Sequence, residues 1–305
     1  MAETILFLSP GYPAEMADFT RGLAQCGVRV VGLGEHPVGA MPAIVRHSLA
    51  DYLQVPLFDG AEVLRQVQRY AARQRIDRVE CLWEPFMTLA ATLREELGVA
   101  GMSVAQTELF RDKEKMKQAL DKAGVRTPRH TTAIGASAIR AAAASIGYPL
   151  VIKPIAGAGS AHTHAVRNDD ALEGAIADVG PRQVSVEEYI EGEEYTYDTV
   201  CRDGDVLFEN IAWYRPKPII GRAEEWISMQ TVNLRNPGRA ELAPGIELGR
   251  QVIDALGYRT GFTHMEWFLT PSGEAVFGEI GGRPPGGRSV DLMNYTHDFD
   301  IYRGW

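Results

Sequence analysis

Two glutamates late in the chain have the type and spacing of a metal-binding pair. Glu266 and Glu279 lie in apolar segments on either side of the turn Pro271-Ser272-Gly273. A symmetric hairpin centred between the last two residues of this turn places the glutamates directly opposite each other, roughly 4.5–5.5 Å apart. Like charges at that distance among apolar neighbours require a cation or a shared proton. Mg²⁺ prefers oxygen ligands, so the geometry is consistent with a magnesium site and equally with the alternative that one glutamate faces solvent.

A lysine at the end of an apolar strand is a second candidate. Lys153 follows the apolar residues 149–152 and precedes residues 154–161, which are rich in glycine and alanine. Small residues let backbone N–H groups approach phosphate oxygens, and lysine adds a point charge. Most such turns are only turns, so this signal is weak alone. Lys113, near the start of a predicted helix, is explained equally well by a solvated helix surface.

The acidic run at residues 187–194 is a third candidate. A solvated hairpin end is the ordinary explanation of such a run. Val184, Val186 and Ile190 bury one side of it, however, so some of its glutamates must lie beside apolar surface. Extended backbone can pair with the edge of an adenine, and a carboxylate can bind ribose hydroxyls. This segment could supply both.

The elements that position these residues follow two patterns. In the first hundred residues, short apolar strands alternate with helices, which predicts a parallel sheet covered on both faces. Ligands of such sheets bind beyond the carboxyl ends of the strands, where Gly11 and Glu84 fall. No G-x-G-x-x-G motif follows the first strand, which counts against a dehydrogenase.

From about residue 105 the pattern changes. Asp112 is expected to cap a helix that runs to Ala123, where Gly124 ends it. From residue 148 onward, strands that are not each followed by a helix predict antiparallel sheets and an α+β domain. Residues 215–236 are predicted to form a long loop over a site.

Composition excludes some partners. A net charge of −9 argues against a nucleic-acid surface. No apolar run is long enough to cross a bilayer, and the N-terminus lacks the pattern of a signal peptide. The three cysteines have neither metal-ligand nor disulfide spacing. We therefore expect a cytoplasmic protein with small-molecule partners, no nucleic acid and no membrane.

In order and spacing these pieces resemble the ATP-grasp superfamily, over about residues 105–300. The resemblance implies a Rossmann-like α/β domain at 1–104 and an ATP-grasp domain at 105–305, with a small lid at about 125–195. "DKEKMKQALDKAGVRTP" looks like the family's opening helix, and "YPLVIKPIAGAGS" like its second lysine and phosphate-covering loop. "VEEYIEGEEYTYD" looks like its hinge, and "HMEWFLTPSGEAVFGEIGGRPPGG" like its metal hairpin.

The resemblance also implies roles for individual residues. ATP would be bound with Mg²⁺, and Mn²⁺ is a second candidate for the same ligands. Arg283, at the place of a substrate-binding arginine in carboxylate–amine ligases, and Lys153 would be catalytic, with Arg288 and His264 as weaker candidates. The remaining implied contacts are Lys113, Lys153, Gly157, Gly159 and Ser160 on the phosphates, Glu187, Glu188 and Ile190 on the adenine, Glu194 on the ribose, and Glu266 and Glu279 on the metal.

Two departures from the family pattern stand out. Gly281 occupies a position that is usually asparagine, so either water or another side chain completes the metal shell, or one of two Mg²⁺ ions binds weakly. The chain also ends at Trp305, where relatives commonly continue, and we expect it to be C-terminally truncated.

The implied reaction has two steps. A carboxylate attacks the γ-phosphorus of ATP to form an acyl phosphate and ADP, and an amine then displaces the phosphate. The nearest alternative is a bicarbonate-activating enzyme of the biotin-carboxylase or carbamoyl-phosphate-synthase type. Gly281 motivates another alternative, an ATP-binding regulatory protein without turnover. A homodimer is expected from the family alone.

Overall fold

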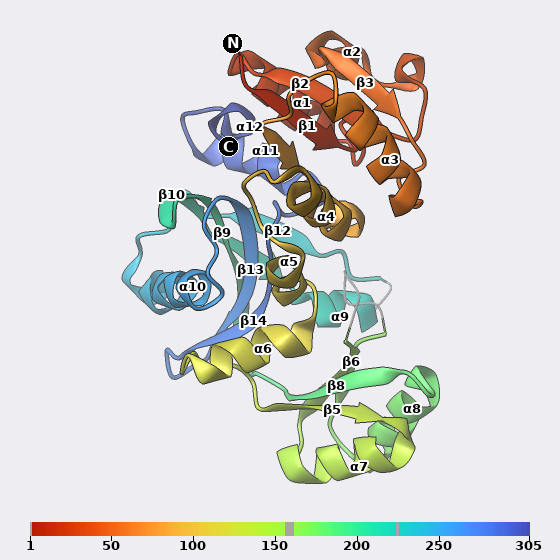
Figure 1. Ribbon diagram of the computed structural model, residues 1–305. Helices are drawn as coiled ribbons and strands as arrows, with labels where there is room; N and C mark the ends of the chain where they lie inside the picture. Colours follow the sequence, from red (N-terminus) through yellow and green to blue (C-terminus); the bar gives the residue numbers. More distant parts are fainter. Residues whose placement is uncertain (1, 156–161, 224–225) are drawn as a thin grey trace. The chain divides into compact units, whose positions relative to one another are not determined.

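A computed structural model describes residues 2–155, 162–223 and 226–305 (Figure 1). The chain divides into two compact units, each built from separate segments. The single boundary near residue 104 inferred from the sequence does not describe the later segments 260–262 and 282–305, which belong to unit 1. Unit 1 comprises Met1–Glu108, Thr260–Phe262 and Gly282–Trp305, and unit 2 comprises Leu109–Arg259 and Thr263–Gly281.

Unit 1 is built on a parallel sheet, sheet A, with the strand order β3-β2-β1-β4. The predicted parallel α/β arrangement is confirmed, and Leu6, Leu33 and Val79 lie in its buried core. Its strands are β1 (Thr4–Leu8), β2 (Arg29–Gly34), β3 (Asp51–Gln54) and β4 (Arg78–Glu80). Its helices are α1 (Met16–Gln25), α2 (Ala43–Ser48), α3 (Gly60–Ala71), α4 (Met87–Leu97), α11 (Ser289–Thr296) and α12 (Ile301–Gly304), and α5 (Val104–Leu109) ends at the unit boundary.

The last helix of the chain packs into unit 1 against α1. The ring centroids of Phe19 and Tyr302 are 4.8 Å apart, and those of Phe19 and Trp305 are 5.4 Å apart. A Cβ on Gly22 would come within 2.0 Å of the Tyr302 carbonyl oxygen. The absence of a side chain at Gly22 therefore lets the two helices approach closely.

Unit 2 contains two antiparallel sheets, as predicted. Sheet B has the order β5-β8-β6-β7, and sheet C has the order β12-β11-β9-β13-β14 with β10 paired to β9. The strands are β5 (His130–Ile134), β6 (Leu150–Pro154), β7 (His164–Val166), β8 (Gln183–Glu188), β9 (Glu193–Arg202), β10 (Asp205–Asn210), β11 (Ala212–Arg215), β12 (Gln230–Asn233), β13 (Gly261–Leu269) and β14 (Ala275–Gly281). The helices are α6 (Lys113–Lys122), α7 (Gly135–Ile146), α8 (Asp169–Val179), α9 (Pro218–Ala223) and α10 (Ala243–Ala255).

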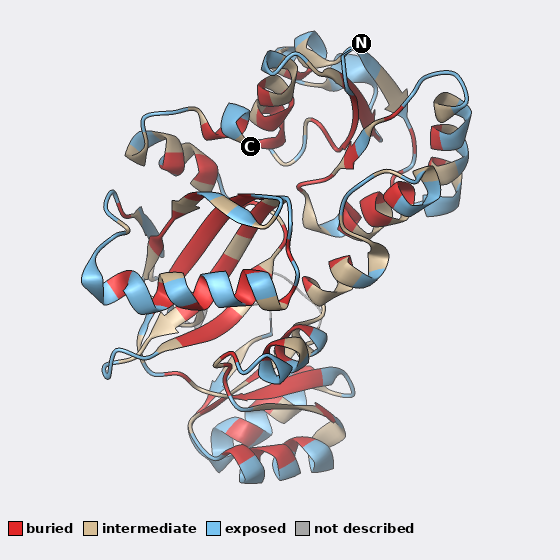
Figure 2. Cartoon of the chain, turned by 60° about the vertical axis from the view of Figure 1, so that its left-hand side comes forward, coloured by how far each residue is buried: buried red, intermediate tan, exposed pale blue. Residues whose placement is uncertain are grey.

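Two helices beyond residue 148, α8 and α10, were not predicted from the sequence. In α10, Leu248, Val252 and Ile253 are buried at helical spacing, and Figure 2 shows the exposed opposite side of this helix. A Cβ on Gly245 would lie 2.1 Å from the Trp267 ring, and one on Gly249 would lie 2.2 Å from the Tyr197 ring. These glycines make the helix harder to predict, because glycine has a low helix propensity. They are needed because α10 packs closely against aromatic rings on the sheet.

The prediction of a long loop at residues 215–236 is also wrong. The segment contains α9, and β12 pairs with β11, with Thr231 opposite Tyr214 and Val232 opposite Trp213. A four-residue strand is stabilised by its partner across the sheet, which no local pattern reveals. Among the described helices, none is both long enough and apolar enough to cross a membrane.

Helix α6 begins where the sequence predicts. The carboxylate of Asp112 accepts hydrogen bonds from the backbone N–H groups of Glu114 and Lys115, both at 3.0 Å. This N-cap satisfies donors that the first helical turn would otherwise leave unpaired. After the helix, Gly124 adopts a φ of +74°. The cap fixes Lys113 at the first helical position.

The hairpin of β13 and β14 pairs Glu266 with Glu279, as predicted. The predicted centre is wrong, because Leu269 pairs with Ala275 and the turn is centred on Ser272. A bulge between Glu266 and Trp267, with Gly278 as the extra residue, restores the pairing of the two glutamates. A Cβ on Gly278 would lie 2.8 Å from the Glu266 carbonyl oxygen. The bulge therefore requires glycine.

We expect Gly278→Ala to destabilise the protein by about 1–3 kcal/mol, because the added methyl group forces the two strands apart at the bulge. Gly174→Ala in α8 is the matched control, since a Cβ there meets no atom within 4 Å, and it should be neutral or stabilising. Urea unfolding of both variants measures the difference. Equal midpoints would show that the hairpin accommodates a side chain at Gly278.

Candidate active site

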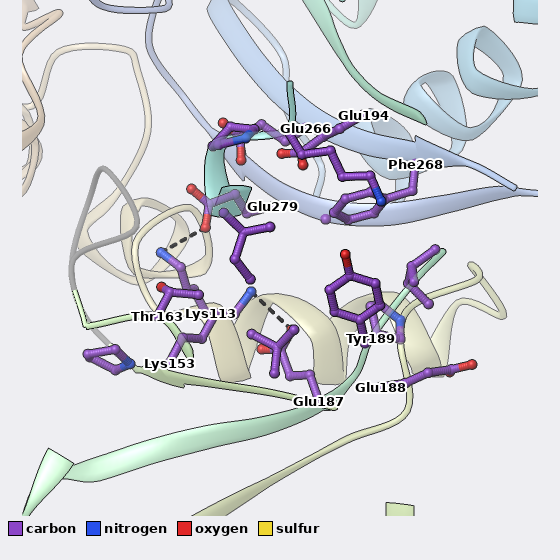
Figure 3. Close-up of a pocket in the computed structure, with 18 residues that line it drawn as sticks. Lys113, Lys153, Thr163, Glu187, Glu188, Tyr189, Glu194, Glu266, Phe268 and Glu279 are labelled. Atoms are coloured by element: carbon purple, nitrogen blue, oxygen red, sulfur yellow. Dashed lines mark ion pairs between the residues drawn. The ribbon is translucent and has the colours of Figure 1, made fainter. Parts of the chain in front are cut away.

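A pocket in unit 2 gathers residues from both of its sheets and from α6 and α9 (Figure 3). Eight of the residues singled out from the sequence line it, although they are spread over more than 160 positions. These eight are Lys113, Lys153, Glu187, Glu188, Ile190, Glu194, Glu266 and Glu279. The other lining residues are Pro128, Val151, Pro154, Thr163, Tyr189, Lys217, Pro218, Ile219, Phe268 and Gly278.

Cations and carboxylates alternate within this pocket. The Lys113 ammonium lies 2.9 Å from a carboxylate oxygen of Glu279, and the Lys153 ammonium lies 3.0 Å from one of Glu187. Figure 3 shows both pairs directed into the same space. The sequence-predicted phosphate-binding lysines and metal-binding glutamates are thus brought together in one cluster.

Glu187 has a second lysine partner that sequence reasoning missed. Lys117 forms an ion pair with Glu187, and both side chains are almost fully buried. Burial and the charge of Lys153 lower the pKa of Lys117 to about 8. Burial alone would raise the pKa of Glu187, but Lys153 and Lys117 outweigh it and hold that pKa far below its usual range. Lys117 follows Lys113 by one helical turn, so the signal for it was the shared face of α6.

Three glutamates from sheet C converge on the opposite wall. Burial and the negative charge of Glu266 raise the pKa of Glu194 to about 8. Burial also opposes ionisation of Glu279, but Lys113 and Lys153 keep its pKa below the usual value. This wall therefore carries carboxylates whose mutual repulsion a divalent cation would relieve.

The donors on this wall fit Mg²⁺ as far as the described residues go. Glu266 and Glu279 supply paired carboxylate oxygens on one face of the hairpin, and Mg²⁺ accepts such ligands together with phosphate oxygens and water. No group of three or more histidine, cysteine, aspartate or glutamate residues suited to a metal occurs among the described residues. An ion held here would thus draw its remaining ligands from a nucleotide and solvent.

The segment after β8 lies at one end of the pocket. The Glu188 carboxylate accepts a hydrogen bond from the Arg129 backbone N–H at 3.1 Å and lies 3.5 Å from the Arg126 guanidinium. The Glu188 side chain is thus engaged with neighbouring arginines, and the role predicted for this residue concerns only its backbone.

The apolar walls and one further cation were not predicted. Val151, Ile219 and Phe268 provide surface suited to a flat ring. Phe268 lies two residues beyond Glu266 on β13, so strand alternation could have revealed it. Lys217 places its ammonium 5.3 Å from the centre of the Tyr189 ring. Nothing local identified Lys217, because its position depends on the connection between β11 and β12.

Four further predicted site residues are not among the described residues that line the pocket. Gly157, Gly159 and Ser160 lie outside the described residues. Arg283 belongs to unit 1, where its Nε donates a hydrogen bond to Glu84 at 2.6 Å and its Nη1 donates one to the Pro284 carbonyl at 3.0 Å. Its role toward a substrate remains a prediction.

Comparisons with known proteins agree with this fold and pocket. Residues 110–212 match the family described as the ATP-grasp domain. The formate-dependent phosphoribosylglycinamide formyltransferase of Synechococcus sp. (strain RCC307) is 30% identical over 92% of this chain and 69% of its own length. The chain belongs to the ATP-grasp superfamily, which confirms the resemblance noted in the sequence.

Relatives with ligase names are among the matches. The L-arginine-specific L-amino acid ligase of Bacillus subtilis is 28% identical over 74% of this chain, which spans 58% of that ligase. The crystal structure of an L-amino acid ligase from Bacillus licheniformis superposes with a TM-score of 0.77 at 20% identity, covering 99% of this chain and 72% of that one. This structural likeness shows the fold.

We expect Glu187→Gln to make stability less sensitive to acid. Because the folded pKa of Glu187 lies below its ordinary value of 4.5, its contribution to stability is present above that pH and is lost as the pH falls. Between pH 4.5 and 3, the unfolding free energy of the wild type should fall more steeply than that of the variant, by up to about 1.4 kcal/mol per pH unit.

Urea unfolding at several pH values measures these slopes. Glu247→Gln, on the exposed face of α10, is the control and should keep the wild-type slope. A Glu187→Gln protein with the wild-type slope would mean that the buried lysines do not hold Glu187 ionised.

Proposed function

We propose that the chain is an ATP-dependent ligase that activates a carboxylate as an acyl phosphate, which an amine then attacks, with ADP and phosphate as products. The observation that carries the proposal is the pairing, within one pocket, of Lys113 and Lys153 with the carboxylates of Glu279 and Glu187. Membership of the ATP-grasp superfamily and relatives named as ligases support it.

The lysines would position the triphosphate and offset its charge. The first step brings two anions together, so positioning and charge neutralisation dominate catalysis of phosphoryl transfer. Lys113 at the start of α6 and Lys153 at the end of β6 approach the pocket from separate elements. Glu187 holds Lys153 through an ion pair, and the buried Lys117 in turn pairs with Glu187. Mg²⁺ on Glu266 and Glu279 would neutralise phosphate oxygens when bound.

The remaining walls would bind the nucleoside. Val151, Ile219 and Phe268 would contact the adenine ring, and the backbone of Glu188 and Ile190 would pair with its edge. Glu194, close to Glu266, would bind the ribose hydroxyls. Arg283 has a planar guanidinium that suits a carboxylate or an acyl phosphate. It would hold the acceptor carboxylate or the acyl-phosphate intermediate. A homodimer remains an expectation drawn from the family.

We expect Glu279→Gln to reduce ATP turnover at least about 10²-fold, because it removes a carboxylate that would hold the Mg²⁺ needed to neutralise the phosphates. The protein should remain folded. Glu274→Gln is the control, since Glu274 lies on the same hairpin but pairs with Arg126 at its exposed end. Turnover is measured as phosphate release, with folding checked by circular dichroism. Wild-type turnover in Glu279→Gln would contradict the metal assignment.

A screen of pooled carboxylates and amines tests the reaction itself. We expect phosphate release that requires one carboxylate and one amine together, with ADP as the nucleotide product, because an acyl phosphate forms by transfer of the γ-phosphoryl group. Chromatography identifies the nucleotides. AMP and pyrophosphate as products would overturn the acyl-phosphate mechanism.

A further inference from the structure

A buried polar network lies in sheet C beside the candidate metal ligands. Its centre is Asp198 on β9, which is 1% exposed. One carboxylate oxygen accepts hydrogen bonds from the Thr196 hydroxyl at 2.9 Å and from the Asn210 side-chain amide at 3.0 Å. The other oxygen lies 2.6 Å from Nδ1 of His264. Residues from β9, β10 and β13 thus hold this carboxylate in one orientation.

The network fixes the direction of the His264 ring. Because Nδ1 bonds to Asp198, the opposite ring nitrogen must point away from it. That nitrogen, Nε2, lies 3.8 Å from a carboxylate oxygen of Glu266. His264 and Glu266 are two residues apart on β13, so both side chains lie on the same face of the strand. The chain of contacts runs from Asp198 through His264 to Glu266.

The residue opposite His264 on β14 is a glycine and has no side chain. His264 pairs with Gly281 on β14, next to the pairing of Glu266 with Glu279. Gly281 is the position where the sequence departs from the family's usual asparagine. Because Gly281 has no side chain, His264 is the member of this residue pair whose side chain can contact the Glu266 carboxylate.

We infer that His264, held by Asp198, is a positioning residue that orients the Glu266 carboxylate for binding Mg²⁺ with a nucleotide. The inference rests on the function proposed above. A carboxylate, an imidazole and a ligand in series are a common way to fix a metal ligand, and losing such support typically weakens metal affinity about 10–100-fold. A buried charged network is costly to fold, so its presence is weak evidence for a purely stabilising role.

A neighbouring buried pair provides a control for a purely structural role. The hydroxyls of Thr199 and Thr263 lie 2.6 Å apart, and both residues are fully buried. Each is adjacent in sequence to a member of the network, but adjacent strand residues face opposite sides of the sheet. Loss of this pair should therefore disturb packing of the same strands without reaching Glu266.

The experiment measures ADP binding by calorimetry at a series of Mg²⁺ concentrations. We expect His264→Gln to raise the Mg²⁺ concentration for half-maximal enhancement of ADP binding about tenfold or more, with metal-free ADP binding unchanged. Thr263→Val should lower thermal stability and leave the Mg²⁺ dependence unchanged. A shift in His264→Gln no larger than in Thr263→Val would overturn the inference.

Asp198 tests whether the contacts act in series. Asp198→Asn removes the charge but keeps the shape, and it should shift the Mg²⁺ dependence in the same direction as His264→Gln. The double variant should be no worse than His264→Gln alone, because residues that act through one another are not additive. Additive effects would overturn the series arrangement.

Glu266→Gln distinguishes failure of the proposed metal site from failure of the positioning role of His264. If the wild type shows Mg²⁺-dependent ADP binding that Glu266→Gln abolishes while His264→Gln does not change it, only the positioning role falls. If the wild type binds ADP without any Mg²⁺ dependence, the proposed metal site and the role of His264 fall together.

Discussion

The pocket of unit 2 depends on neutralising charge inside a largely buried space. A lone ionised side chain there would be costly, and only opposite charges with good geometry offset the loss of water. Lys113 with Glu279 and Lys153 with Glu187 satisfy this condition at 2.9 Å and 3.0 Å. Burial, together with the negative charge of Glu266, raises the pKa of Glu194, so this side of the pocket disfavours a further unpaired negative charge. A magnesium–nucleotide complex, carrying both signs of charge, is the kind of ligand that such a surface accommodates.

The backbone geometry of the surrounding helices and strands positions these charged side chains. The Asp112 cap places Lys113 in the first turn of α6, and β6 ends at the residue after Lys153. On the other side, the glycine bulge at Gly278 keeps Glu266 and Glu279 in register. Each device is local and rigid, so the charged atoms are held by secondary structure rather than by flexible side-chain contacts alone.

Support behind the pocket comes from residues that do not line it. Lys117 approaches Glu187 from α6, and Asp198 approaches His264 from β9. Lys117 fixes Glu187, which lines the pocket, and Asp198 fixes His264, which lies beside Glu266. Such support restricts rotamers and keeps the reacting geometry ready before a substrate arrives.

Short-range patterns of strand periodicity and helix capping predicted the parallel and antiparallel sheets and the start of α6. The resemblance to the family pointed to eight of the residues that line the pocket. The pairing of Glu266 with Glu279 was also predicted, but it depends on the bulge at Gly278, which the assumed symmetric turn did not include. The helix α10, the strand β12 and the contacts of Lys117, Lys217 and Asp198 became visible in the three-dimensional fold and were not predicted. Their signals depend on residues distant in the chain, as when Gly245 is chosen to fit the ring of Trp267. Local propensity cannot report a contact whose partner is supplied by another strand.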